Sequence, residues 1–385
     1  MYRNSSVAVV VPAYNEASFI ADVLRDVPEY VDRIYAVDDC STDDTRREIE
    51  RTAADLNART GGSFDRVVAL AHEENRGVGG AIKTGYERAR DDDVDVTAVM
   101  AGDGQMDPDE LERFLDPIID GRADYTKGNR LWRRDHWESM SGWRQFGNRL
   151  LTLLTRIASG YWEMSDPQNG YTAISKHALE TVPLEDLYED YGFANDLLVH
   201  LNVNDLRIAD VPHEAVYGDE ESDIAYASFV PQLSVLLLRD FCWRLKTNYL
   251  VLNFHPTVLC YVLGVVGTVS SAARALATFR PGRESVTRSG AHSERFLSFA
   301  VFLLGSLFLV LALVFDMEQN ENLVVRTDGS VRSDDRSEDQ HTSEDTHERA
   351  PERGRENATE RVDDDPFLGR EHGPTDASGR HGGGR

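Results

Sequence analysis

The chain has 385 residues, of which 67 are acidic and 41 are lysine or arginine, so its formal net charge is −26. This acidity argues against nucleic acid as a partner, because binding to a phosphate backbone relies on clustered basic residues. Hydrophobic residues make up 41% of the chain, which is enough to build a globular core. The large negative charge is typical of proteins from salt-loving microbes, in which salt screens the repulsion.

The cysteines and the N-terminus both indicate a reduced location facing the cytosol. Cys40, Cys242 and Cys260 lack the close paired spacing of zinc or redox motifs. No signal peptide opens the sequence, since the first apolar run already ends within a motif at Pro12. We therefore expect the N-terminus to stay in the cytoplasm.

The first hundred residues alternate short apolar runs with helical patterns. This rhythm is typical of βαβ units and predicts an α/β domain with a mostly parallel sheet. Ligands bind such sheets at the carboxyl ends of the strands, where the most distinctive polar motifs occur. The expected strands cover residues 7–11, 33–37, 67–71 and 94–100, and the expected helices begin near residues 17, 43 and 77.

Two of these motifs follow the first and second strands. In VVVPAYNE (residues 9–16), Pro12 stiffens the turn, Tyr14 offers a face to a base or ribose, and Glu16 lies near a helix start. An ordinary strand-to-helix turn explains this motif equally well. In VDDCSTDDT (residues 37–45), helix capping explains the later residues but not the adjacent Asp38 and Asp39, one of which could accept a hydrogen bond from a base.

A glycine-rich segment and an acidic turn follow. The glycines of NRGVGGAIKTGYERA (residues 75–89) match neither common phosphate-loop pattern, so close packing of a helix explains them better. MAGDGQMDP (residues 100–108) ends the fourth strand. In it Asp103, Gln105 and Asp107 alternate, and an acidic residue at a strand end is favourable if it binds a hard cation such as Mg²⁺ or Mn²⁺, which takes oxygen ligands and would bridge to a diphosphate. A plain polar turn would explain Asp107 as a helix cap but would explain Asp103 poorly.

The second half of the chain indicates membrane association. Residues 227–248 combine an apolar run with the basic, aromatic stretch RDFCWRLK, which predicts an amphipathic helix at a membrane surface. Two apolar segments, about 250–273 and 296–315, are candidate transmembrane helices within residues 249–316. The alternative is a buried helical hairpin in a soluble core. Residues 317–385 are polar and acidic and are predicted to be a disordered tail.

Taken in this order, the motifs at residues 9–16, 37–45 and 100–108 resemble those of the family 2 glycosyltransferases, in particular dolichyl- or polyprenyl-phosphate hexose synthases. The resemblance spans roughly residues 7–223. It implies a GT-A fold over residues 1–226, a UDP- or GDP-sugar donor, and inversion at the anomeric carbon. It also implies a metal held by Asp103 and Gln105, although Ala101 stands where the family has the first Asp of its DxD pattern. The implied donor-binding residues are Pro12, Tyr14, Glu16, Asp38, Asp39 and Asp103.

On the acceptor side, the resemblance implies arginines that bind phosphate. KGNRLWR (residues 127–133) resembles a Gly-Ser-Arg stretch and supplies Arg130, and Arg144 and Arg149 resemble a later arginine pair. SDPQNGYTA (residues 165–173) contributes Asp166 and Asn169, but Thr172 replaces an Arg of that element. YGFANDLL (residues 191–198) directs Asp196 toward the acceptor.

A lipid phosphate is already anionic, so Arg130 and Arg144 would position it without a strong base. A hydroxyl acceptor would instead need a base, for which Asp196 is the leading candidate. For His213 and Glu220 we expect a solvated loop rather than a catalytic role.

Two alternatives stay open. A processive polysaccharide synthase would carry a QxxRW motif and more spans, and neither is found. A nucleotide-sugar-binding scaffold without catalysis is supported only by Ala101. Because nucleotide sugars are cytoplasmic, the expected arrangement is a cell-membrane protein with two spans and with its catalytic domain and both termini in the cytoplasm. The sugar, the base, the lipid and the oligomeric state stay open.

Overall fold

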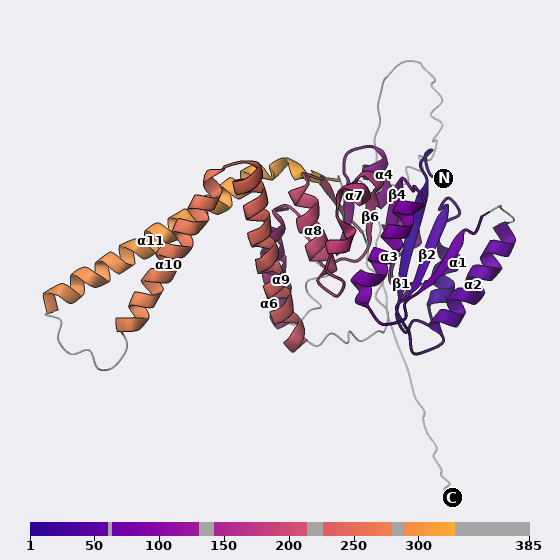
Figure 1. The fold of residues 1–385 in the computed structure, drawn as a ribbon, viewed down its shortest axis with the longest axis horizontal. Coiled ribbons are helices and arrows are strands. Elements are labelled where there is room, and N and C mark those ends of the chain that lie inside the picture. The colour runs from indigo at the N-terminus through magenta and orange to yellow at the C-terminus, as the bar shows by residue number, and fades with distance from the viewer. Residues whose placement is uncertain (61–63, 131–141, 214–225, 279–287, 328–385) are drawn as a thin grey trace, which may run out of the picture. The chain divides into compact units, whose positions relative to one another are not determined.

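The computed structural model describes residues 1–60, 64–130, 142–213, 226–278 and 288–327. Its centre is an eight-stranded sheet with the order β3-β2-β1-β4-β6-β5-β7-β8 (Figure 1). Every neighbouring pair is parallel except those of β6, which runs antiparallel to β4 and β5. The strands are β1 (Val7–Ala13), β2 (Arg33–Asp38), β3 (Val67–Ala71), β4 (Val96–Val99), β5 (Tyr125–Asn129), β6 (Thr172–Ser175), β7 (Ile208–Pro212) and β8 (Val324–Arg326).

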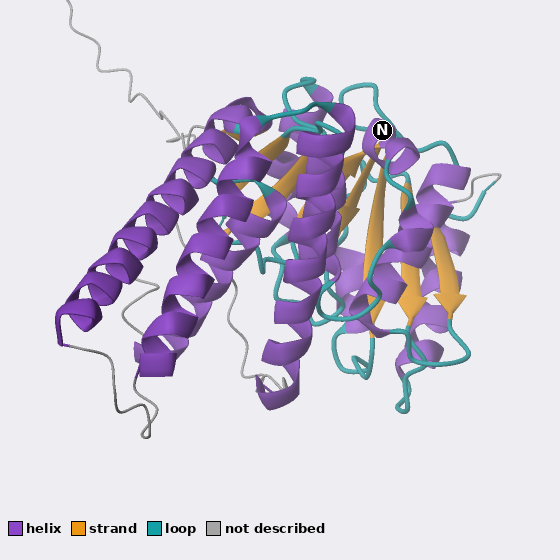
Figure 2. Ribbon diagram, turned by 60° about the vertical axis from the view of Figure 1, so that its left-hand side comes forward, coloured by secondary structure: helices purple, strands orange, loops and turns teal. Residues whose placement is uncertain are grey.

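Helices cover both faces of the sheet (Figure 2). Strand β1 is buried along its whole length, so its alternate side chains enter two separate cores. Ala8 and Val10 pack toward α3 and α8, whereas Val7, Val9 and Val11 pack toward α1 and α4. The helices are α1 (Ile20–Asp26), α2 (Thr45–Thr60), α3 (Gly77–Asp91), α4 (Leu111–Ile119), α6 (Gly142–Ser159), α7 (Lys176–Thr181), α8 (Phe193–Val203), α9 (Tyr226–Lys246), α10 (Pro256–Thr278) and α11 (Arg288–Gln319).

The glycines of α3 serve close packing, as predicted. A Cβ atom on Gly79 would lie 2.7 Å from the carbonyl oxygen of Glu189, and one on Gly85 would overlap the side chain of Val10. Helix α3 can therefore approach both the sheet and the segment before α8 only because these positions lack side chains. The strand-to-helix order expected for the first hundred residues is confirmed with it.

Helix α9 covers the predicted amphipathic segment, but one face of it packs against the α/β domain. Leu233, Leu236 and Leu237 are buried against α6 and its neighbours, while Val235 and Leu238 are exposed. Arg244 corrects the sequence interpretation. The sequence predicts this residue on a helix at a membrane surface, yet its side chain is fully buried and pairs with Asp316. The location of α9 at a membrane surface stays a prediction.

Helices α10 and α11 are long and apolar enough to cross a membrane, over Pro256–Ala277 and Glu294–Gln319. The first begins later than the predicted residue 250, because Thr247–Leu252 forms a π-helical segment and Asn253 is extended before Pro256. In the most apolar 18-residue stretch of each helix, only 28% is buried within the protein for α10 and 11% for α11. This exposure contradicts a hairpin buried in a soluble core. The two helices touch closely at Gly267 and Gly305.

The predicted tail begins too early. Order continues past α11, and β8 pairs in parallel with β7 through Val324 opposite Ile208. A three-residue edge strand has too little pattern to be found in a polar sequence, because its stability comes from pairing with a distant strand. Residues 328–385, most of the predicted tail, lie outside the described residues.

Candidate active site

Three loops meet at the carboxyl edge of the sheet. The carbonyl oxygen of Ala13, at the end of β1, accepts a hydrogen bond from Asp39 N (2.9 Å), and that of Pro12 accepts one from Gly102 N (3.1 Å). The motifs after β1, β2 and β4 are therefore in direct contact, as parallel strands require. Tyr14 is 47% exposed beside them, so its ring can offer a face to a planar ligand.

The loop after β1 is braced against the loop after β2. Asn15 has a φ of +60° and its side-chain oxygen accepts a hydrogen bond from Thr42 N (2.8 Å). The backbone N–H of Glu16 donates to Thr45 Oγ1 (2.7 Å). These bonds fix the path of the chain around Tyr14 and place the start of α1 beside that of α2.

Asp38 and Asp39 are both buried at the end of β2. Asp39 Oδ1 lies 2.6 Å from Nδ1 of His72 and accepts a hydrogen bond from Arg76 N (2.9 Å). The other ring nitrogen of His72 lies 2.9 Å from Thr84 Oγ1. His72 is not predicted from the sequence, because a single histidine after a strand carries no pattern of its own. It orients the carboxylate of Asp39.

Asp103 is half-buried in the turn after β4, and its Oδ1 accepts a hydrogen bond from Gln105 N (2.9 Å). Gly104 has a φ of +74°, which bends the chain so that residues 103 and 105 lie on one tight turn. Asp107 caps the following turn by accepting from Asp109 N, as predicted. Within the described ranges, no group of three His, Cys, Asp or Glu residues could hold a metal ion.

Several of the residues predicted to bind the acceptor gather around the ends of β5 and β7 and the start of β6. Arg130 Nε donates to Asp166 Oδ2 (2.9 Å), and Lys127 Nζ donates to the carbonyl oxygen of Asn169 (2.5 Å). Asn169 Nδ2 lies 2.7 Å from Nε2 of His213. The structure thus brings Arg130, Asp166 and Asn169 together with two residues that were not predicted, Lys127 and His213. We call these five residues the Arg130 group.

His213 corrects the expectation of a solvated loop. Its ring is buried edge-on against Phe114 and Tyr171, next to Asn169. Aromatic packing across distant segments leaves no local sequence signal, which explains the error. Glu220 lies outside the described residues.

Burial and charge act together in this group. Burial lowers the pKa of the Lys127 ammonium to about 8, although Asp166 opposes the shift. Burial alone would raise the pKa of Asp166, but the cations Arg130 and Lys127 outweigh it and hold that pKa below the usual value. Burial also raises the pKa of Asp210, on the neighbouring strand, to about 6. The site thus keeps two cations next to a buried carboxylate.

The remaining predicted residues lie on helices. Arg149 is exposed on α6, and the side chain of Arg144, on the first turns of the same helix, lies outside the described residues. Asp196, on α8, is only 1% exposed, and its Oδ2 accepts a hydrogen bond from Tyr188 N (2.8 Å). Its carboxylate is 3.6 Å from the ring of His200 and close to Asp240 of α9.

The side chain of Asp196 therefore lies against α9. The preceding residue, Asn195, contacts the loop that carries Asp166 and Asn169. Asn195 Oδ1 accepts a hydrogen bond from Gln168 Nε2 (3.0 Å), in the loop between Asp166 and Asn169. Burial raises the pKa of Asp196 and lowers that of His200. Burial and the nearby Asp196 raise the pKa of Asp240 to about 7.

The two neighbouring carboxyl groups of Asp196 and Asp240 should make the stability of the protein depend on pH. Because the folded protein binds a proton at Asp240 more tightly than the unfolded chain, its stability should fall as pH rises from about 4 to about 7. Asp240→Asn should therefore raise the free energy of unfolding at pH 8 by about 1–2 kcal/mol and flatten this dependence. Thermal unfolding at pH 5 and pH 8 measures both effects. Asp55→Asn, an exposed carboxylate on α2, is the control, and equal shifts for the two variants would refute the carboxyl pair.

The sequence of this chain is similar to those of known glycosyltransferases. Residues 8–182 match the model of Glycosyl transferase family 2. A UDP-N-acetylglucosamine–dolichyl-phosphate N-acetylglucosaminyltransferase of Methanococcus voltae is 30% identical over 216 residues, which are 55% of this chain and 86% of that protein. An undecaprenyl-phosphate mannosyltransferase of Micrococcus luteus is 29% identical over 215 residues, 54% of this chain and 82% of that protein.

Among solved structures, glucosyl-3-phosphoglycerate synthase from Mycobacterium tuberculosis is similar with a TM-score of 0.44 and 19% identity, over 63% of this chain and 80% of that one. The match to the family model and to the M. voltae enzyme shows that the chain belongs to glycosyl transferase family 2. It is a glycosyltransferase, and its mostly parallel sheet with the antiparallel β6 is the expected GT-A fold.

Proposed function

We propose that this protein transfers a hexose from a UDP- or GDP-sugar to a dolichyl or polyprenyl phosphate, with inversion at the anomeric carbon and with a divalent cation. The observation that carries the proposal is the arrangement along one sheet edge. The loops after β1, β2 and β4 are in contact, the Arg130 group follows at β5–β7, and the same chain continues into an apolar hairpin. Two relatives whose names specify dolichyl-phosphate and undecaprenyl-phosphate acceptors support this choice.

On the donor side, Tyr14 would stack on the base or ribose, and Asp38 and Asp39 would accept hydrogen bonds from the nucleoside. Pro12 and Glu16 would shape the pocket around it. Asp39 is suited to this because His72 and Arg76 N already fix its orientation. A carboxylate that is held by its own neighbours loses little freedom when a ligand binds.

The metal proposal rests on oxygen chemistry. Asp103 and Gln105 share one turn and provide a carboxylate and an amide, which are hard ligands suited to Mg²⁺ or Mn²⁺. So few protein ligands fit a cation that arrives with the substrate, since Mg²⁺ is commonly held by one or two carboxylates plus phosphates and water. When bound, the cation would neutralise charge on the departing diphosphate.

On the acceptor side, the phosphate oxygen would attack the anomeric carbon as the bond to the diphosphate breaks, and this single displacement inverts the configuration. Arg130, Arg144 and Arg149 would bind the phosphate, and Asp166 and Asn169 would hold the arginine-bearing loop in place. An anionic nucleophile needs no proton removed, so the burial of Asp196 behind α9 is compatible with the reaction.

We also propose that the catalytic domain and both termini lie on the cytoplasmic side of the cell membrane, where nucleotide sugars occur. Helices α10 and α11 pack against each other as a pair, and β8, which follows α11, pairs with β7 of the catalytic sheet. This pairing supports an even number of spans in the described chain, because the catalytic domain lies before α10 and β8 after α11.

The test is to incubate the purified full-length protein with radiolabelled UDP- and GDP-sugars, Mn²⁺ and polyprenyl phosphate, and to measure label in the lipid fraction. We expect label with one donor class, and no label when the metal is chelated. No label in the lipid fraction with any donor would refute the proposal. Label on a lipid with a free hydroxyl, but not on the phosphate, would replace it with transfer to a hydroxyl acceptor.

A further inference from the structure

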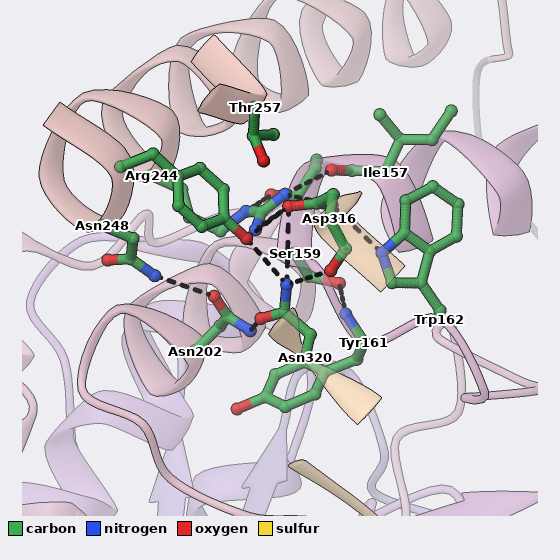
Figure 3. Close-up of polar contacts among 12 residues, drawn as sticks. Ile157, Ser159, Tyr161, Trp162, Asn202, Arg244, Asn248, Thr257, Asp316 and Asn320 are labelled. Carbon is green, nitrogen blue, oxygen red and sulfur yellow. Dashed lines mark hydrogen bonds and ion pairs between the residues drawn. The ribbon is translucent and has the colours of Figure 1, made fainter. Parts of the chain in front are cut away.

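A buried polar cluster joins the catalytic domain to the paired apolar helices α10 and α11, which we call the membrane hairpin (Figure 3). We call it the junction cluster. The guanidinium of Arg244, on α9, donates to both carboxylate oxygens of Asp316, on α11, at 2.9 and 3.0 Å. Both side chains are completely buried. The cluster also contains Trp162, Asn202, Tyr249 and Asn320.

The partners of Arg244 and Asp316 come from both parts of the chain. Arg244 also donates to the carbonyl oxygens of Ile157 (3.0 Å) and Ala158 (2.9 Å), at the end of α6. Asp316 accepts further hydrogen bonds from Trp162 Nε1 (3.0 Å) and from the hydroxyl of Tyr249 (2.6 Å). A buried ion pair that is fully hydrogen-bonded in this way holds one geometry, because any shift leaves a charge without a partner.

The backbone leaves little room for movement at this point. Gly160 follows α6 with a φ of +81°, and a Cβ atom there would lie 2.7 Å from the Arg244 guanidinium. Asn202, on α8, donates to the side-chain oxygen of Asn320, just after α11 (2.8 Å). The junction cluster thus ties the end of α11 to α6 and α8.

A second link runs from the hairpin to the acceptor side of the site. After Asn320 the chain forms β8, which pairs with β7, and Thr327 Oγ1 donates to the carbonyl oxygen of Asp210 (2.5 Å). The carboxylate of Asp210 accepts from Asn129 Nδ2 (2.9 Å), the residue before Arg130. The end of α11 is therefore connected through short, ordered segments to the strands that carry the Arg130 group.

We propose that Arg244 and Asp316 are positioning residues for the acceptor, holding the Arg130 side of the site at a fixed height and tilt relative to the membrane hairpin. The inference rests on the proposed function. A lipid phosphate is confined to the bilayer surface, so the site must be held where that phosphate lies. A water-soluble acceptor diffuses to the site wherever it is, and it does not need this alignment.

The test uses full-length Arg244→Lys and Asp316→Asn. Transfer is measured to a long-chain polyprenyl phosphate in vesicles and to a short-chain, water-soluble polyprenyl phosphate, with the donor that the wild type uses. We expect the ratio of the long-chain rate to the short-chain rate to fall about tenfold or more, since small misplacements of reacting groups cost rates of this order. A ratio equal to that of the wild type, in either variant, would overturn the proposal.

A smaller fraction of folded protein lowers both rates by the same factor. This factor cancels in the ratio of the two rates. Tyr249→Phe, which removes one hydrogen bond to Asp316 and leaves the ion pair intact, is a milder variant for the case that the other two cannot be purified folded; a smaller fall of the ratio, in the same direction, is expected in it, and an unchanged ratio would overturn the proposal. The controls make matched changes at exposed sites of the same helices: Arg239→Lys on α9 and Glu318→Gln on α11. A wild type that labels neither acceptor would refute the proposed function itself, whereas a normal wild type with unchanged ratios would refute only this inference.

Discussion

Replacing Asp103 with alanine is expected to lower the rate of sugar transfer by about two to three orders of magnitude, the usual cost of removing a group that stabilises charge in a transition state. The fold should survive, because Asp103 is half-exposed and its carboxylate accepts from a neighbour in its own turn, Gln105 N. The measurement is the transfer rate to polyprenyl phosphate at saturating donor over a range of Mn²⁺ concentrations. Thermal unfolding of the same preparation checks the fold.

Two further variants separate charge from shape at this turn. Asp103→Asn keeps an acceptor for Gln105 N but loses the charge, so it should be nearly as inactive as Asp103→Ala. Asp109→Asn removes an exposed carboxylate from the same segment and should keep the wild-type rate. Retained activity in Asp103→Ala, with an unchanged response to Mn²⁺, would show that the metal assignment is wrong. Ala101→Asp restores the family's missing carboxylate and should lower the Mn²⁺ concentration needed for half-maximal rate.

The strands that lead into the predicted donor-binding loops could be predicted because they are buried on both faces. Val7–Ala13 is an unbroken apolar run that ends in polar residues, and this pattern marks both a parallel strand and the point where a ligand can bind. The contact among the loops after β1, β2 and β4 then follows from the parallel order of the strands. The α/β fold and the contact among these three loops were therefore predictable in outline.

The parts that were missed depend on partners far away in the sequence. Arg244 belongs to a stretch with basic and aromatic residues that reads as a surface helix, and only Asp316, 72 residues later, converts it into a buried ion pair. His72 and His213 are single histidines whose roles come from Asp39 and Asn169. Strand β8 is too short to show a period. The local sequence pattern indicates which face of a helix or strand is apolar. It does not indicate which distant residue will form a hydrogen bond with a buried polar group.

Arg130 joins a buried carboxylate to the edge of the candidate site. Its guanidinium contacts both oxygens of Asp166, at 2.9 and 3.4 Å, while its own side chain is 38% exposed at the site edge. It therefore both compensates a buried carboxylate and presents charge where an anionic acceptor would bind. Arg130→Ala should lower the transfer rate to polyprenyl phosphate about a hundredfold, mainly through the acceptor, because a bound phosphate would no longer be oriented.

A structural role alone would give a different result, and Arg130→Lys distinguishes the two. Lysine keeps the charge near Asp166 but loses the planar fork, so stability should stay close to that of the wild type while the rate still falls. Arg130→Ala should also lose about 1–2 kcal/mol of stability, because Lys127 would then be the one cation left beside Asp166 among the residues that the structure describes. Arg326→Ala breaks an exposed ion pair with Glu163 and serves as the control. If both Arg130 variants lose stability but keep the wild-type KM and kcat for the acceptor, Arg130 only anchors Asp166, and the phosphate must be bound by other arginines.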